Sequence, residues 1–188
     1  MKGWEISFPY SIEVLQQLVC LSWHSTPATV VSKLVNIPKQ LWSPPSPGLI
    51  KWNDDASVNA GRSKSAIGGV LRNSQGLFMC LFSSPIPPME INSAEILAIF
   101  RVAQISMAFE HLRQQHIIIE YDSSNAVKWC NDKEGGPWNL NFQLNYIRNA
   151  WKEWMNLSIV HKGRSSNVVA DALAKQGTQQ IMECSISV

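Results

Sequence analysis

Four acidic residues of this 188-residue sequence stand at the ends of apolar segments or inside them. Asp55 closes an apolar run, and Asp122 directly follows the apolar run 117–121. Glu95 and Asp171 lie in helical patterns made mostly of alanine and larger aliphatic residues. A lone carboxylate is expensive in such a setting because it loses its hydration. These four acids are therefore candidates for a shared chemical role.

Each acid also has a simpler structural explanation. Asp55 could form a turn, and Asp122 could cap the helix expected to follow it. Asn92 and Glu95 have the spacing of a capping box, in which Asn92 begins the helix and Glu95 reaches back to it. Asp171 could be a solvated helix residue. Taken one at a time, these explanations are at least as good as a functional one.

The sequence predicts five strands and four helices that would position the acids. The strands are expected over 49–55, 66–72, 77–83, 116–121 and 157–161, and the helices over 92–112, 123–130, 140–154 and 167–176. Residues 73–76 (NSQG) indicate a turn that joins the second and third strands as an antiparallel hairpin. The order predicts an α/β fold with a mixed five-stranded sheet, antiparallel over the first three strands, extended by parallel strands and flanked by helices.

In this arrangement the four acids meet at one edge of the sheet. If the first and fourth strands are neighbours, their ends carry Asp55 and Asp122 side by side, and helices that begin near Asn92 and Ser166 reach the same edge. Two carboxylates about 5 Å apart repel by roughly 3 kcal/mol at an effective dielectric near 20. Bound cations would relieve that repulsion. Ligands that are all oxygen favour magnesium or manganese over zinc.

Prolines divide the chain into parts. Residues 11–36 have a helical apolar pattern, and four prolines between positions 38 and 47 indicate an extended linker. We expect an N-terminal helical segment and linker over 1–48, one domain over 49–180, and a C-terminal tail over 181–188. The first part is too short to hold a core of its own.

Composition argues against several classes of protein. With 45% hydrophobic and 16% charged residues the chain is typical of a globular domain. A net charge of +2 gives no general signal for nucleic acid, so any such contact must come from a local site. Cys20, Cys80, Cys130 and Cys184 lack the spacing of zinc ligands, which favours buried, reduced thiols over an interaction module held by zinc or disulfides.

Localisation is also constrained by the sequence. No apolar run approaches the roughly 18 residues that a membrane-spanning helix needs. Glu5 and Glu13 interrupt the N-terminal apolar residues and argue against a signal peptide. We therefore expect a soluble intracellular monomer, cytoplasmic or nuclear, with no membrane partner.

Five segments, taken together and in order, are specific. They are WNDDAS (52–57), AIGGVLRNSQG (66–76), NSAEILAI (92–99), IIIEYDSSNAVKW (117–129) and HKGRSSNVVADALAKQG (161–177). With this spacing the chain resembles the plant ribonuclease H-like domain of non-LTR retrotransposon reverse transcriptases and their single-domain relatives. The resemblance covers about 130 residues, and the preceding stretch WSPPSPGLIKWN (42–53) resembles the linker that commonly leads into this domain.

The resemblance implies a type 1 ribonuclease H fold and a two-metal endoribonuclease that hydrolyses the RNA strand of an RNA–DNA hybrid. By it, Asp55, Glu95, Asp122 and Asp171 match the acidic ligands of two Mg²⁺ ions, with Mn²⁺ as a substitute. His161 matches the family's mobile active-site histidine, although a histidine that only closes a strand is the simpler explanation.

Further positions would contact the nucleic acid. Asn92 matches a residue that contacts the minor groove of the hybrid, where 2′-hydroxyl groups distinguish RNA from DNA. Ser57, Ser124 and Asn167 occupy neighbouring motif positions, and we assign them to the same nucleic-acid interface. Ser124 stands where the family often has glutamine.

Departures from the family pattern keep other functions open. Ala56 replaces the usual glycine after the first acid, and Asp54 replaces an apolar residue or threonine. The loop 131–139 has no cluster of lysine and arginine, which would weaken binding to a hybrid. The alternative is a degenerate retroelement-derived domain that binds nucleic acid with little or no catalysis. Another metal nuclease of the superfamily, an exonuclease or resolvase, is less favoured because of the SAE motif and the Asn167–Asp171 spacing.

Overall fold

The structure is a computed structural model that describes residues 42–59, 61, 63–132, 135–154, 156–179 and 184–187. The helical segment expected within 11–36, and Cys20 with it, lie outside the described residues.

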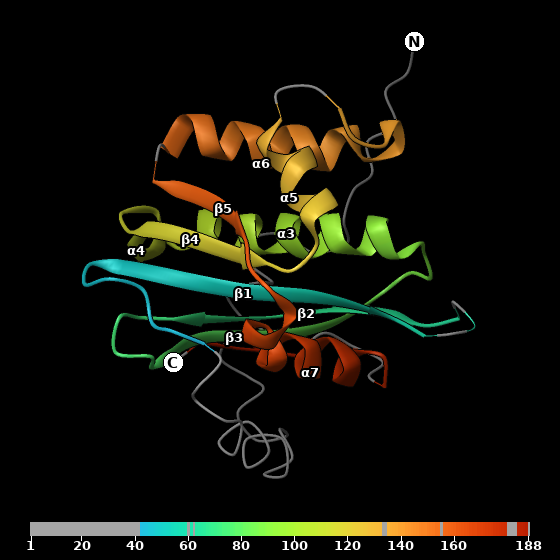
Figure 1. The fold of residues 1–188 in the computed structure, drawn as a ribbon, viewed down its shortest axis with the longest axis horizontal. Coiled ribbons are helices and arrows are strands. Elements are labelled where there is room, and N and C mark those ends of the chain that lie inside the picture. The colour runs from blue at the N-terminus through green and yellow to red at the C-terminus, as the bar shows by residue number, and fades with distance from the viewer. Residues whose placement is uncertain are drawn as a thin grey trace.

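A single mixed sheet forms the centre of the described structure (Figure 1). Its strands are β1 (Leu49–Val58), β2 (Ser65–Arg72), β3 (Phe78–Ile86), β4 (His116–Tyr121), β5 (Leu157–His161) and β6 (Cys184–Ser187), in the spatial order β5-β4-β1-β2-β3-β6. β1, β2 and β3 pair antiparallel, and β4 and β5 extend the sheet in parallel from β1. The predicted five-stranded mixed sheet is confirmed.

The sheet has a sixth strand that the sequence did not predict. β6 pairs antiparallel with β3, so part of the segment 181–188, expected to be a tail, belongs to the sheet. Its four residues are too short a run to carry a clear alternating pattern, and pairing with the edge of β3 defines it.

Helices cover both faces of the sheet. They are α3 (Ile91–Ala108), α4 (Glu110–Arg113), α5 (Ser124–Asn131), α6 (Asn141–Trp154) and α7 (Val168–Gly177), with short 3-10 turns η2 (Trp138–Leu140) and η3 (Arg164–Ser166). In Figure 1, α3, α5 and α6 lie on one side of the sheet and α7 lies on the other. The single helix predicted over 92–112 is wrong, because Phe109 is extended (φ −104°, ψ 115°) and separates α3 from α4.

The main core lies between the sheet and α3, α5 and α6. Trp52 of β1 is fully buried there, and its indole Nε1 donates to Ser106 Oγ of α3 at 3.1 Å. Phe82 of β3 packs edge-on against the Trp52 ring. Burial of such large side chains fixes α3 against β1 and so fixes the acid that α3 carries.

The opposite face of the sheet receives α7 at very short range. A Cβ atom added at Gly68 would lie 2.3 Å from the backbone nitrogen of Ala174, so only glycine lets the helix come this close. The hydroxyl of Ser83 donates to the Leu173 carbonyl at 2.8 Å. This seat places α7, with Asp171, beside β1 and β2.

Residues 42–48, which the sequence assigned to the linker, contact the sheet. The Trp42 ring lies 4.3 Å from the Arg72 guanidinium carbon, and Ser43 accepts a hydrogen bond from Lys51 Nζ at 3.0 Å. Lys51 also forms a buried ion pair with Glu120 at 2.7 Å. The lead-in segment therefore covers Lys51 and Arg72, and its contacts offset part of the hydration that these residues lose on burial.

The described residues bear on what the sequence predicted for the cysteines and for membrane-spanning segments. The side chains of Cys80 and Cys130 are both buried, as the sequence predicted. Within the described ranges, no helix is both long and apolar enough to cross a membrane.

Candidate active site

Strand β1 carries two consecutive aspartates on opposite faces of the sheet. Asp55 pairs with Gly68, the glycine that faces α7, whereas Asp54 pairs with Gly69, whose added Cβ would meet the Phe82 ring. Cross-strand partners point to the same face. Asp55 therefore faces the α7 side at 5% exposure, and Asp54 faces the main core at 0% exposure.

Asp122 lies next to Asp55 because β1 and β4 run in parallel. Asn53 is aligned with Glu120 in that register, and Asp55 and Asp122 follow each by two residues. The explanation of Asp122 as a helix cap is wrong, because Ser123 is the N-cap of α5 and its Oγ accepts from the Ala126 amide at 3.3 Å. Asp122 therefore does not cap α5, and its carboxylate is available to the site at this edge of the sheet.

Glu95 reaches this edge from the first half of α3. The capping-box explanation is wrong, because α3 begins after Glu90, and Asn92 lies inside the helix rather than at its cap. Burial raises the pKa of Glu95, a hydrogen bond with the Ser123 side chain opposes that rise, and the charge of Asp122 adds to it. Among the described atoms, Glu95 Oε2 is a buried carboxylate oxygen that has no hydrogen-bond partner.

Burial and neighbouring charges both act on Asp55. Burial and then the charge of Asp122 raise the pKa of Asp55 from 3.8 to about 7, and Asp171 contributes further. The Ala56 amide, which donates to Asp55 Oδ1 at 2.9 Å, and the charge of Arg164 oppose this rise. Ala56 itself stays in the β1 ladder opposite Ile67, so replacing the family's glycine leaves the strand regular here.

Asp54 is buried without compensation. Of the described side chains it is one whose two carboxylate oxygens both lack a hydrogen-bond partner, and burial raises its pKa well above 3.8, with Asp55 and Asp122 adding to the effect. The charge of an ionised Asp54 would therefore be a cost to the core.

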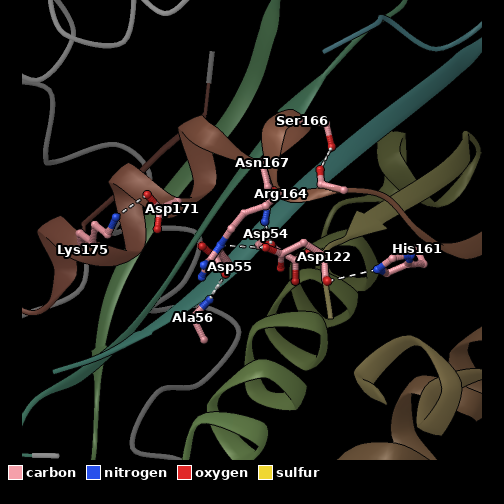
Figure 2. A network of polar contacts seen from close by, with 11 residues as sticks. Asp54, Asp55, Ala56, Asp122, His161, Arg164, Ser166, Asn167, Asp171 and Lys175 are labelled. Carbon is pink, nitrogen blue, oxygen red and sulfur yellow. Dashed lines mark hydrogen bonds and ion pairs between the residues drawn. The ribbon is translucent and has the colours of Figure 1, made fainter. Parts of the chain in front are cut away.

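Two basic side chains form ion pairs with Asp122 and Asp171 (Figure 2). Arg164 Nε lies 3.4 Å from Asp122 Oδ2, and Lys175 Nζ lies 2.7 Å from Asp171 Oδ2, one helical turn further along α7. Figure 2 shows Arg164 reaching towards Asp55 and Asp122, while Asp171 turns towards Lys175.

The connection from β5 to α7 brings two more of the expected residues to the edge. His161 is exposed at the end of β5, and its Nε2 lies 3.2 Å from the Asp122 carbonyl oxygen (Figure 2). Asn167 is buried, and its Nδ2 donates to the Asp54 carbonyl at 2.8 Å. Asn167 therefore ties the start of α7 to β1, a role that the sequence did not assign to it.

The other expected nucleic-acid residues surround the acids on different elements. Asn92 is exposed in the first turn of α3, and Ser124 is exposed in the first turn of α5. Ser57 is half-buried near the end of β1, opposite Ala66. Of these elements, α3 carries Glu95, β1 carries Asp55, and α5 begins two residues after Asp122.

The donor chemistry of the edge suits a hard divalent cation. Burial and like charge raise the pKa of Asp55 to about 7, the charge of Asp122 acts on both Asp55 and Glu95, and Glu95 Oε2 is a potential ligand that has no hydrogen-bond partner among the described atoms. In the part of the chain that the structure describes, however, no three His, Cys, Asp or Glu side chains are close enough together to hold a metal ion.

Sequence reasoning missed Arg164, Lys175 and the capping role of Ser123. Lys175 could have been found, because an acid and a lysine four residues apart on a helix face each other. Ser123 also had a signal, as a serine at the start of a helical pattern. The approach of Arg164 in η3 to Asp122, just after β4, joins residues 42 positions apart and has no local signal.

Residues 53–177 match the family model described as reverse transcriptase-like, which is two thirds of the chain and includes every one of the four acids. The chain belongs to the reverse transcriptase-like family. A comparison of this reverse transcriptase-like chain with curated proteins found no match.

The solved structures similar to this reverse transcriptase-like domain include ribonucleases H1. RNase H1 from the archaeon Halobacterium salinarum NRC-1 is 22% identical with a TM-score of 0.61, over 70% of this chain and 98% of that one. LC11-RNase H1, isolated from compost by a metagenomic approach, is 22% identical with a TM-score of 0.64, over 70% and 96%. Another structure of LC11-RNase H1, in complex with an RNA/DNA hybrid, is 23% identical with a TM-score of 0.61, over 69% and 96%. At these identities the likeness establishes a ribonuclease H-like fold.

Proposed function

We propose that this chain is an endoribonuclease that hydrolyses the RNA strand of RNA–DNA hybrids with two divalent cations, Mg²⁺ or Mn²⁺. The observation that carries the proposal is the alignment of Asp55 within β1 and Asp122 just after the end of the neighbouring strand β4, where burial and the charge of Asp122 raise the pKa of Asp55 to about 7. Carboxylates held together at this cost are typical of a site built for cations or for proton transfer. The complex of LC11-RNase H1 with an RNA/DNA hybrid supports the choice of substrate.

In this proposal Asp55, Glu95, Asp122 and Asp171 hold the cations. When bound, the two ions supply a nucleophilic water and stabilise the departing 3′ oxygen, which leaves a 5′-phosphate on the product. Asp55 is held rigidly by β1 and by the Ala56 amide, so its oxygens keep one orientation. Glu95 approaches from α3 with an unpartnered Oε2.

His161 is proposed to carry a proton at the site. It is exposed, and the only contact assigned to its ring among the described residues is with the carbonyl oxygen of Asp122, so the ring can move towards a substrate phosphate. A histidine is suited to this role because its ordinary pKa lies near neutral pH.

Nucleic-acid contacts are proposed for Asn92, Ser124 and Ser57, with Asn167 positioning the backbone around them. Asn92 and Ser124 are exposed on helices that begin at the acid edge, so their polar groups can reach a bound strand. Hydrogen bonds to 2′-hydroxyl groups would select RNA over DNA. We also propose that the chain acts as a monomer, in the cytoplasm or nucleus, and that its resemblance to retrotransposon domains reflects a common origin in plants.

A gel assay with end-labelled hybrid, RNA duplex and DNA duplex tests the proposal, each in Mg²⁺, Mn²⁺ and chelator. We expect cleavage of the RNA strand of the hybrid alone, with metal only. Asp55→Asn and Asp122→Asn should abolish it, and His161→Ala should slow it by about ten- to a hundredfold. Asp54→Val is the matched control, because it alters the adjacent aspartate on the opposite face and should leave cleavage intact. Equal cleavage of DNA duplex would contradict the assignment.

The second candidate is a degenerate domain that binds nucleic acid without cutting it. It is favoured by the two ion pairs that engage Asp122 and Asp171 in the structure. It predicts binding of a fluorescent hybrid that is unchanged by chelator, together with no cleavage in either metal.

A further inference from the structure

Arg164 brings a positive charge of the chain to the acids. Its Nε lies 3.4 Å from Asp122 Oδ2 (Figure 2). The two partners differ sharply in exposure, because the Arg164 side chain is 83% exposed and the Asp122 side chain is only 12% exposed. The Arg164 guanidinium therefore lies on the solvent side of Asp122, whose carboxylate is largely buried.

The charge of Arg164 acts on more than its direct partner. Its positive charge also acts on the carboxylates of Asp55 and Glu95, in the opposite sense to the negative charge of Asp122. One guanidinium therefore offsets repulsion among three of the four acids. A divalent cation would do the same at the same place.

The backbone around Arg164 is fixed rather than free. In η3, Ser166 N and Oγ both donate to the Gly163 carbonyl, and Asn167 N donates to the Arg164 carbonyl at 3.0 Å. The Asn167 side chain then bonds to the Asp54 carbonyl. The turn is thereby anchored to the strand that carries Asp55, so the backbone of Arg164 is held near the acids.

We propose that Arg164 is a built-in counter-ion that competes with divalent cations for Asp122, so that loading of the metal requires its side chain to move away. The inference rests on the proposed metal site. A guanidinium and a divalent cation repel each other, and they cannot both be close to one carboxylate oxygen without weakening each other's binding. The high exposure of Arg164 means that it loses little when it returns to solvent.

Titration of the metal-free full chain with Mn²⁺, followed by the EPR signal of free Mn²⁺, tests this competition without any nucleic acid. We expect Arg164→Ala and Arg164→Gln to bind Mn²⁺ about three- to tenfold more tightly than the native chain. Arg164→Lys keeps the charge and should stay within about twofold of native. Lys162→Ala, which removes an equal charge two residues away, is the matched control and should change the affinity by less than about twofold.

A second measurement follows the arginine directly. In ¹H–¹⁵N spectra, the Nε–Hε resonance of Arg164, assigned by its loss in Arg164→Gln, should shift as Mg²⁺ is added. Mn²⁺ affinity that is unchanged or weaker in both neutral variants, with a native chain that binds Mn²⁺, overturns this inference alone. Absence of Mn²⁺ binding in every variant, with melting curves that show folded protein, overturns the metal site as well.

Discussion

The side-chain amide of Asn167 donates a hydrogen bond to the main-chain carbonyl of Asp54 at 2.8 Å, joining residues 113 positions apart. The bond links the first turn of α7 to the strand that carries Asp55. Because Asn167 is 2% exposed, water cannot replace the bond if it is lost. The bond therefore holds α7, which carries Asp171, against β1, which carries Asp55.

We expect Asn167→Ala to lower the free energy of unfolding by about 1–3 kcal/mol, because the Asp54 carbonyl is left buried and unpaired. Urea denaturation measures this loss. Asn167→Asp is the matched variant, since it keeps the shape of the side chain but lacks the amide donor. If Asn167→Asp were as stable as the native chain, the amide would not be the group that matters.

Asp54→Val should stabilise the protein. The described structure leaves both carboxylate oxygens of Asp54 buried without a hydrogen bond, and burial raises its pKa well above 3.8. A β-branched apolar side chain suits a buried strand position, so we expect a gain of about 1–3 kcal/mol in the free energy of unfolding. Asp54→Asn, which stays polar, should gain less. A loss of stability in Asp54→Val, measured with urea at pH 7, would show that the carboxylate has a partner of importance.

The metal-free protein should become less stable as the pH rises. The raised pKa of Asp55, about 7 against 3.8, means that the folded chain keeps a proton that the unfolded chain has lost. This contribution to stability is complete below about pH 4 and disappears as the pH rises through about 7, and it amounts to about 4 kcal/mol in full. Melting temperatures in chelator between pH 5 and 8 measure it. Asp55→Asn should have a flatter profile, and an equally steep fall in that variant would assign the effect to other groups.

Gly68→Ala should disrupt the seat of α7. The added Cβ would lie 2.3 Å from the Ala174 nitrogen and 2.6 Å from the Leu173 carbonyl carbon, so a helix backbone would have to shift. We expect a loss of about 2 kcal/mol or more in stability, by the cost of overpacking, together with reduced hybrid cleavage because Asp171 moves. Gly163→Ala is the matched control, because its added Cβ would meet nothing within 4 Å. Urea denaturation and the hybrid cleavage assay compare the two variants, and equal effects would remove the argument from close packing.

The alternation of apolar residues determined most of the fold. The apolar run Ile117–Tyr121 predicts a strand, and the helical spacing of apolar residues around Ala98 predicts a helix. The order of such elements restricts the sheet to few topologies. Local patterns were less reliable at the ends of elements. The break at Phe109 and the pairing of β6 depend on contacts with distant residues, and the sequence carries little local signal for either.

The sequence by itself determined which acids could share a site, because Asp55 and Asp122 follow apolar strand patterns that would lie side by side if the first and fourth strands were neighbours, as the structure shows them to be. Only the tertiary structure decided how each acid is balanced. The burial of Asp54, the approach of Arg164 to Asp122 and the anchoring of Asn167 on β1 join residues far apart in the chain. Desolvation and charge pairing depend on these distances in space, and a pattern of residue types along the chain does not contain them.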